Sequence, residues 1–254
     1  MKNKGRESSE FLRPQHSLYI SEPLRASMEL GSLALYSSWL DLAPQGDGHA
    51  VMVIPGFTAD GRSTKILRDY ICRLGYSVSC WRQGVNLGVR KDLFDGAMAV
   101  LNELFERHDG RVSIVGQSLG GIYAREMAKS RPEKVRQVIS LGSPFNDPGG
   151  VRSNVSELYK LFNPEKSPKS AQSRSIQWNP QLAPSVPTTA IYSKSDGVCH
   201  WRSCIQHGGG HDRLENIEVA VSHIGMVVNA QVFYVVADRL AQDQERWRPF
   251  NSGE

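Results

Sequence analysis

The chain has 254 residues, of which 40% are hydrophobic and 22% charged, with 23 glycines and 13 prolines. This is the composition of a globular protein, and it excludes a collagen-like chain, a coiled coil and a wholly disordered protein. Lysine and arginine outnumber aspartate and glutamate by 30 to 26, a net charge of +4. Because the basic residues form no dense stripe interleaved with aromatic residues, we expect no nucleic-acid binding.

The first 17 residues are polar and charged, and we expect them to form a mobile tail. They contain neither the apolar segment nor the small-residue cleavage site of a signal peptide. The uncharged stretch from Leu30 to Leu40 is too short to span a bilayer, which takes about 20 apolar residues. The cysteines are too few for a disulfide scaffold: Cys72, Cys80, Cys199 and Cys204. We therefore predict a cytoplasmic protein, with residues 18–254 forming a single domain.

A helix is predicted over residues 22–42, with Pro23 near its start. Its apolar side chains recur near helical spacing: Leu24, Met28, Leu35, Trp39 and Leu42. A helix this apolar is unusual on a solvent-facing surface. We expect it to cover an edge or face of a sheet or, alternatively, to make peripheral contact with a membrane surface or a protein partner.

Short apolar runs and amphipathic helical runs then alternate along the chain. The predicted strands are short and rich in β-branched residues, and they cover residues 50–54, 76–80, 112–115, 135–141, 188–192 and 217–221. The predicted helices cover residues 63–74, 91–108, 119–130 and about 227–242. This alternation predicts an α/β fold, in which a mainly parallel sheet of about six strands carries helices on both faces.

The interval from residue 145 to 186 interrupts this alternation, because no strand is predicted within it. A helix is predicted at 151–161, and residues 163–175 are rich in proline, serine and lysine. Long loops in compact domains are commonly functional or mobile. We interpret the interval as a small lid inserted between two strands.

The predicted strand at 112–115 leads directly into Gly116-Gln117-Ser118-Leu119-Gly120, a G-x-S-x-G pattern that a predicted helix follows. In such a sharp strand-to-helix turn the serine takes a strained backbone conformation, and glycines are needed where strand and helix come close. The Ser118 hydroxyl would then stand clear at the carboxyl end of the sheet. The pattern alone is weak evidence, since an idle serine in a tight glycine turn fits it too, and it is the context of strand and helix that favours a nucleophile.

With these residues the chain resembles the α/β-hydrolase superfamily, close to small bacterial lipases and esterases, over roughly residues 50–243. That resemblance implies a triad in the chain order Ser, Asp or Glu, His. Asp196 follows the predicted strand at 188–192 in the run S-K-S-D-G-V, and His223 follows the one at 217–221 in the run S-H-I-G. The resemblance implies that Ser118 is the nucleophile, that His223 is its base, and that Asp196 orients the imidazole.

The resemblance also implies an oxyanion hole with two backbone donors. We expect these to be the N–H groups of Leu119, directly after the nucleophile, and of Phe57, in the Pro55-Gly56-Phe57 loop after the first strand. Pro55 departs from the family, where histidine is commoner, and this leaves the shape of the loop open. The run at 141–145 also resembles a lipase strand end, and we expect it to help line the pocket.

Several other residues offer competing chemistry near Asp196. A short run after Asp196 has the residue types of a zinc site: Cys199, Cys204, His207 and His211. It lacks the longer stretch that usually separates two pairs of zinc ligands. His200 and His211 are rival bases and Asp212 a rival acid, yet no predicted strand precedes them. The run His207-Gly208-Gly209-Gly210 has the letters of an esterase oxyanion loop, but it lies after the acid instead of after the first strand. We expect no metal and no cofactor.

The sequence therefore predicts a serine hydrolase that cleaves a small-molecule carboxylic ester. The apolar helix at 22–42 and the apolar residues at 158–162 favour a substrate with an apolar acyl group. Serine in the turn argues against the dehalogenase and epoxide-hydrolase branches of the superfamily, which use aspartate there. A thioesterase or acyltransferase with the same triad stays open, as do a hydrolase-fold binding protein without turnover and the oligomeric state.

Overall fold

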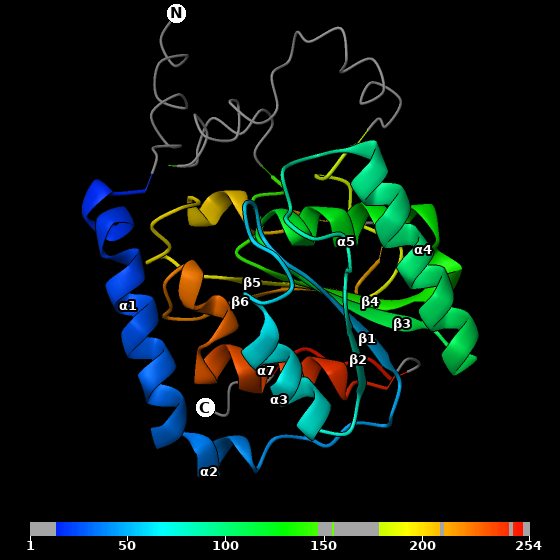
Figure 1. The fold of residues 1–254 in the computed structure, drawn as a ribbon, viewed down its shortest axis with the longest axis horizontal. Helices are drawn as coiled ribbons and strands as arrows, with labels where there is room; N and C mark the ends of the chain where they lie inside the picture. The colour runs from blue at the N-terminus through cyan, green and yellow to red at the C-terminus, as the bar shows by residue number, and fades with distance from the viewer. Residues whose placement is uncertain (1–13, 147–153, 155–177, 209–210, 244–245, 251–254) are drawn as a thin grey trace, which may run out of the picture.

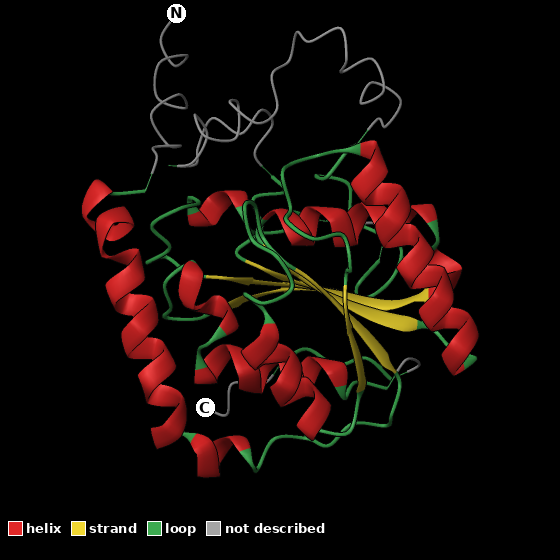
Figure 2. Ribbon diagram, viewed as in Figure 1, coloured by secondary structure: helices red, strands yellow, loops and turns green. Residues whose placement is uncertain are grey.

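The computed structural model describes residues 14–146, 154, 178–208, 211–243 and 246–250. Its centre is a sheet of six parallel strands in the order β2-β1-β3-β4-β5-β6. Helices lie on both sides of this sheet (Figures 1 and 2). The predicted α/β architecture, with about six mainly parallel strands and two helical layers, is confirmed.

The strands are β1 (Ala50–Ile54), β2 (Ser77–Cys80), β3 (Val112–Gln117), β4 (Val135–Leu141), β5 (Thr188–Tyr192) and β6 (Leu214–Glu218). The bounds of β1, β4 and β5 match the prediction. The helices that cover the sheet are α3 (Lys65–Arg73), α4 (Lys91–His108), α5 (Leu119–Ser130) and α7 (Ala230–Leu240). The sequence prediction gives α4 and α5 their observed bounds.

Alternate side chains of the strands build two separate cores. In β1, Val51 and Val53 belong to the core beneath α3 and α7, whereas Met52 and Ile54 belong to the core beneath α4 and α5. All five side chains of β1 are buried, as expected for a central parallel strand covered on both faces. Because all six strands are parallel, their carboxyl ends meet at one edge of the sheet. Ligands bind at this edge in open α/β sheets.

The N-terminal helices differ from the prediction. One helix was expected at 22–42 after a tail at 1–17, but the structure has α1 (His16–Leu35) and α2 (Ser37–Leu40), with Pro23 inside α1. Residues 16 and 17 are therefore helical, while residues 1–13 lie outside the described residues. Hydrogen bonds within α1 hold its first turns, because the Leu18 carbonyl accepts from Ser21 Oγ and Arg25 Nη2 at 3.1 and 2.9 Å. α1 packs against α7 and against the 3₁₀ helix η5 (Ile224–Val227), beside the carboxyl edge of the sheet.

The last strand also differs, because β6 covers Leu214–Glu218 instead of the predicted 217–221. Val219 and Val221 are buried and apolar, as a strand would be. Beyond Val219, however, the chain is held by a side chain of the neighbouring segment: Val221 N–H donates to Ser193 Oγ at 3.3 Å. The loop that carries His223, here called the histidine loop, is consequently longer than predicted, since His223 follows β6 by five residues and not two.

The prediction of a lid at 145–186 lies largely outside the described residues, as does the helix expected at 151–161. Within the described part of this interval, residues 178–186 contain no strand. None of the helices in the described ranges is both long enough and apolar enough to cross a bilayer.

Candidate active site

Ser118 occupies the turn between β3 and α5 with a backbone conformation of φ 50° and ψ −121°. A residue other than glycine rarely adopts a positive φ, and it does so where the surrounding structure enforces it. The enforcement is visible here, because Ser118 N–H donates to the Leu141 carbonyl at 2.8 Å and Gly121 N–H donates to the Ser118 carbonyl at 3.0 Å. The serine is thus fixed at the carboxyl end of the central strand, as predicted.

The glycines of the G-x-S-x-G turn are required by packing. A Cβ atom on Gly116 would lie 2.4 Å from the Gly120 backbone. One on Gly120 would lie 2.4 Å from the Ile54 carbonyl oxygen of β1. These neighbours are backbone atoms and cannot move aside independently, so a side chain at either position would push α5 off the sheet.

Asp196 and His223 form a buried hydrogen-bonded pair at the same edge. Asp196 Oδ2 lies 2.6 Å from His223 Nδ1, and the two side chains are 1% and 8% exposed. The other carboxylate oxygen, Oδ1, accepts from the N–H groups of Val198 and Cys199 at 2.8 and 2.7 Å. These backbone donors fix the carboxylate so that one oxygen is left to face the imidazole.

The pKa of His223 is raised above its ordinary value of 6.5. Burial acts to lower it, but the charge of Asp196, the hydrogen bond to Asp196 and the charge of Glu22 outweigh burial. The imidazole is thus a stronger base than a histidine in water. Such a shift, produced by a carboxylate partner in a cleft, is typical of functional sites.

Ser118 and His223 line one cavity of about 630 Å³. Five of its lining residues come from α1: Tyr19, Pro23, Ala26, Ser27 and Leu30. The lining also includes Gly56 and Phe57, from the loop after β1, and Val227. The walls are mostly apolar, with Ser118 and His223 among the few polar groups that face the space, which is the usual make-up of a small-molecule site.

The loop after β1 runs directly beside Ser118. A Cβ atom on Gly56 would lie 3.3 Å from Ser118 Cβ, and Phe57 lines the cavity. Leu119 is the first residue of α5, and its N–H has no backbone acceptor among the described residues. The two predicted oxyanion donors thus belong to segments that flank Ser118.

Asn86, which is fully buried, holds this loop in place. Its Nδ2 donates to the Pro55 carbonyl at 2.9 Å, its backbone carbonyl accepts from Thr58 N–H at 2.8 Å, and its N–H donates to the Ala59 carbonyl at 2.8 Å. Thr58 has a φ of 62°, which these bonds help to enforce. The sequence alone gives Asn86 no role, because the partner of its side chain lies in a segment about 30 residues earlier in the chain.

The competing residues do not join this arrangement. His200 Nδ1 accepts from Arg202 N–H, and His211 Nε2 donates to the Pro184 carbonyl at 2.9 Å. Neither histidine lines the cavity, and neither does Asp212. Among the described residues no group of three histidine, cysteine, aspartate or glutamate side chains is placed to hold a metal ion. The expectation that residues 141–145 help line the pocket is wrong, because none of them lines this cavity, and a Cβ atom on Gly142 would meet Met226 and Asp196.

A second hydroxyl–imidazole–carboxylate set lies at the opposite, amino edge of the sheet. Ser113 Oγ is 2.8 Å from His49 Nε2, and His49 Nδ1 binds the Asp47 carboxylate. Ser113 is fully buried within β3. Its hydroxyl therefore cannot meet a substrate, and the set links the start of β1 to β3.

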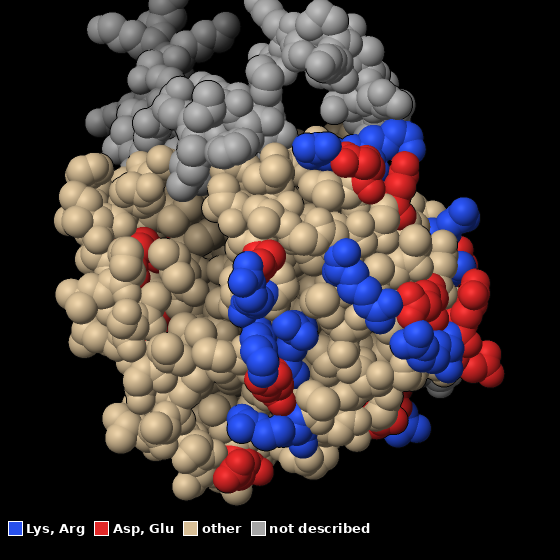
Figure 3. Space-filling view, in the orientation of Figure 1, with Lys and Arg blue, Asp and Glu red and all other residues tan. Residues whose placement is uncertain are grey.

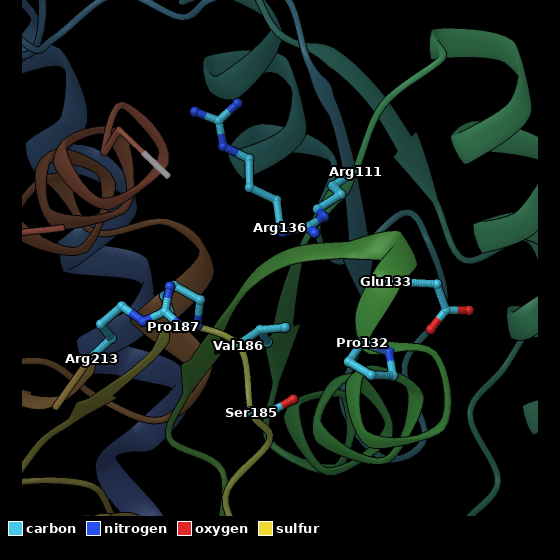
Figure 4. Close-up of a pocket in the computed structure, with 8 residues that line it drawn as sticks. All are labelled: Arg111, Pro132, Glu133, Arg136, Ser185, Val186, Pro187 and Arg213. Carbon is cyan, nitrogen blue, oxygen red and sulfur yellow. The ribbon is translucent and has the colours of Figure 1, made fainter. Parts of the chain in front are cut away.

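Another cavity, of about 250 Å³, also lies at the amino edge (Figure 4). Arg111, Glu133 and Arg213 line it, as does Arg136. The Arg136 guanidinium extends away from Glu133 and donates to Asp47 and to the Gln242 carbonyl, at 2.7 and 3.0 Å. The cavity shares no residue with the one that Ser118 and His223 line.

Solved structures with the same fold include lipases and esterases. Aspergillus fumigatus lipase B superimposes with a TM-score of 0.59 at 17% identity, over 79% of this chain and 55% of that one, so the chain spans about half of that lipase. The metagenome-derived lipolytic enzymes LipS and LipT give a TM-score of 0.55 at 18% identity, over 78% and 94%. A monoacylglycerol lipase from Paleococcus ferrophilus gives 0.55 at 13%, over 78% and 95%. No model of a known protein family and no curated protein matches the sequence.

The six-stranded parallel sheet, its helical layers and these structural neighbours define the class: the chain has the α/β-hydrolase fold. Within that fold, Ser118 lies at the strand-to-helix turn after β3, and the hydrogen-bonded Asp196 and His223 lie in the loops after β5 and β6.

Proposed function

We propose that the protein is a serine hydrolase that cleaves small-molecule carboxylic esters with an apolar acyl group. The observation that carries the proposal is the joint position of three side chains. Ser118 and His223 face one cavity, and the imidazole binds Asp196 through its far nitrogen. A nucleophile, a base and an orienting carboxylate in this order are the parts that acyl transfer needs.

The proposed reaction has two halves. Ser118 Oγ adds to the ester carbonyl carbon while His223 Nε2 takes the hydroxyl proton, and collapse of the tetrahedral intermediate passes that proton to the departing alcohol. Water then adds to the acyl-enzyme while His223 takes its proton. The carboxylic acid product leaves, and His223 returns the proton to Ser118 Oγ. Asp196 keeps the Nδ1 proton in place, which leaves Nε2 free to act as the base.

The N–H groups of Phe57 and Leu119 are proposed to bind the carbonyl oxygen as it becomes an oxyanion. Leu119 N–H also lies at the amino end of α5, where the helix dipole favours negative charge. Loss of one such donor costs about 3–4 kcal/mol in other serine hydrolases.

The proposed apolar acyl group follows from the cavity walls. Pro23, Leu30 and Phe57 line the space beside Ser118, and burial of an acyl chain is worth about 0.8 kcal/mol for each CH₂ group. The lipases and esterases of similar fold support an ester over a sugar or peptide bond.

The test is labelling by a fluorophosphonate probe, which reacts with activated serines. We expect wild type to be labelled and Ser118→Ala not to be. Ser113→Ala is the matched control, because Ser113 lies in β3, the strand directly before Ser118, and its hydroxyl is 2.8 Å from His49 Nε2, but it is buried. Equal labelling of wild type and Ser118→Ala contradicts the proposal. A panel of p-nitrophenyl esters from acetate to palmitate then measures the preferred acyl length.

A second proposal concerns the outer surface of α1. Ile20, Leu24 and Met28 recur every four residues and are 66%, 67% and 67% exposed. The charged residues of α1 all point inward: Glu22 and Glu29 bind backbone N–H groups of the loops behind the helix, and Arg25 binds the Ser195 carbonyl.

Figure 3 accordingly shows the α1 side of this face nearly without charge, while charged side chains gather over α3 and α4. We propose that residues 22–42, together with Ile20, make peripheral contact with a lipid surface.

Flotation of the full chain with phosphatidylcholine vesicles tests this contact. Leu24→Ser with Met28→Ser removes two exposed apolar side chains that do not line the Ser118 cavity, and we expect it to reduce flotation. Leu182→Ser is the control, since Leu182 is 60% exposed in a different part of the chain. Flotation of the double variant equal to that of wild type contradicts the proposal.

A further inference from the structure

We infer that Glu22 of α1 is a positioning residue for the Asp196–His223 pair, so that the N-terminal helix is part of the catalytic apparatus. The inference rests on the proposed function, because it concerns the same base and acid. It adds an element that the sequence resemblance, which begins near residue 50, does not include.

The Glu22 carboxylate bridges the two loops that carry the pair. Its Oε1 accepts from Gly197 N–H at 2.8 Å, directly after Asp196, and from His223 N–H at 3.0 Å. Its Oε2 accepts from Ile224 N–H at 2.9 Å. Glu22 is 2% exposed, and charge-assisted hydrogen bonds of this kind are the strong ones in a buried setting. One side chain thus fixes the spacing between the backbone beside the acid and the backbone of the base.

Neighbouring contacts hold Glu22 against these loops. Arg25 Nη2 binds Glu22 Oε1 at 2.7 Å, and Arg25 Nη1 donates to the Ser195 carbonyl at 2.8 Å. The backbone of α1 also touches the loop after β5 that carries Asp196, here called the acid loop. A Cβ atom on Gly197 would lie 2.5 Å from the Leu18 carbonyl group. The helix therefore contacts the loop on both sides of Asp196, at Ser195 and at Gly197.

Glu29 makes a comparable contact nearer the end of α1. Its Oε1 accepts from Ser222 N–H at 2.8 Å and its Oε2 accepts from Ser222 Oγ at 2.7 Å. Glu29 thus anchors the same helix to the same histidine loop but makes no bond to Asp196, Gly197 or His223. It supplies a matched control, because the same substitution there removes the same kind of anchor.

Glu22 also contributes charge at the base. Among the described residues, the charged groups around His223 are Asp196 from the loop after β5 and, from α1, Glu22 with its partner Arg25, and Glu29, which binds the neighbouring Ser222. Glu22 is a cause of the raised pKa of His223 and Glu29 is not. Removal of the Glu22 charge should therefore make the imidazole a weaker base, while removal of the Glu29 charge should leave its basicity unchanged.

The experiment measures the rate constant of fluorophosphonate labelling of the full chain against pH, together with the melting temperature. Glu22→Gln keeps the size of the side chain but loses the charge and faces an amide NH₂ toward backbone donors. We expect its labelling rate to fall at least tenfold and the midpoint of its pH profile to move to lower pH. Glu22→Asp keeps the charge but has a shorter reach, so its rate should fall while its midpoint stays closer to that of wild type.

Glu29→Gln is expected to keep the wild-type pH midpoint even where its melting temperature falls. Two results overturn the inference alone: Glu22→Gln with the rate and midpoint of wild type, or Glu22→Gln and Glu29→Gln with equal losses of rate and equal midpoints. If Glu22→Gln does not fold, a wild-type rate in Glu22→Asp also overturns it. Failure of wild type to label at Ser118 is a different result, and it removes the proposed function along with the inference.

Discussion

His223 Nδ1 and Asp196 Oδ2 lie 2.6 Å apart, although 27 residues separate the two side chains in the sequence and each comes from a different loop. The loops follow adjacent parallel strands, β5 and β6, whose carboxyl ends share one edge. Neither side chain has room to turn to solvent, because both are buried. The pairing therefore sets both the basicity of the imidazole and a part of the stability of this edge.

The pH dependence of serine labelling should follow His223. Attack by Ser118 requires a neutral imidazole, and the pKa of His223 is raised above 6.5 by the charge and hydrogen bond of Asp196 and by Glu22, against the opposing effect of burial. We expect the labelling rate to rise with pH and to reach half its maximum above pH 6.5. Stopped-time labelling between pH 5 and 9 measures this, and a midpoint below pH 6.5 contradicts it.

The same pair should make stability depend on pH in the opposite sense. A histidine whose pKa is higher in the folded than in the unfolded chain stabilises the fold fully below the unfolded value, near 6.5, and this contribution disappears as pH rises through the folded value. We expect the difference in melting temperature between wild type and His223→Gln to be largest near pH 6 and to shrink at higher pH. A difference that grows with pH would falsify the assignment.

The sequence could predict the parts of the fold that depend on local patterns. Runs of β-branched residues mark β1, β4 and β5 to the residue, because buried parallel strands need such runs. The same reasoning misplaces β6, since Val219 and Val221 are buried beyond the end of the strand. Val219 N–H still donates to the Tyr192 carbonyl of β5 at 2.9 Å, but Val221 N–H donates to Ser193 Oγ, a partner that no local pattern reveals.

The candidate site divides in the same way. Ser118, Asp196 and His223 can be proposed from sequence because each stands in a short run after a predicted strand. Glu22 and Asn86 cannot, because their hydrogen bonds are to backbone groups of distant segments. A glutamate on an apolar helix is expected to face water, and only the contacts of α1 show that it turns inward.

Replacement of the acid should disable the base without a large change in packing. In Asp196→Asn the amide oxygen is held at the Oδ1 position by the N–H groups of Val198 and Cys199. The NH₂ group then faces His223 Nδ1 and forces the imidazole proton onto Nε2, the nitrogen that must accept the serine proton. We expect labelling and ester turnover to fall by about 10⁴-fold, as for this change in other serine hydrolases. A variant that folds like wild type and keeps more than a tenth of its rate contradicts the role of Asp196.

Asn86 should matter for the loop that carries Phe57, the proposed oxyanion donor. Asn86→Ala leaves the buried Pro55 carbonyl without its 2.9 Å donor, which costs about 1–3 kcal/mol of stability. It also frees the loop that carries Phe57, so we expect ester turnover to fall more than the change in stability alone would cause. Gln83→Ala is the control, because Gln83 is in the same segment and its side chain bonds to the Trp81 carbonyl. Equal turnover in the two variants, measured well below their melting temperatures, argues against a role for Asn86.

Gly197 should be required by the contact between α1 and the acid loop. A Cβ atom there would lie 2.5 Å from the Leu18 carbonyl group and 2.7 Å from Tyr19 N. Both are backbone atoms, so in Gly197→Ala the helix or the loop must move, at a cost of about 1–3 kcal/mol. The backbone N–H groups that bind the Glu22 carboxylate lie in the displaced segments. We therefore expect the labelling rate to fall together with the melting temperature.

Gly31→Ala provides the contrast within the same helix. No atom lies within 4 Å of the Cβ position on Gly31, and alanine is favoured over glycine inside a helix by roughly 1 kcal/mol. We therefore expect Gly31→Ala to raise the melting temperature and to label at the wild-type rate. If Gly197→Ala behaves in the same way as Gly31→Ala, then α1 is not in close contact with the acid loop in solution, and the bridge that Glu22 makes to His223 loses its support.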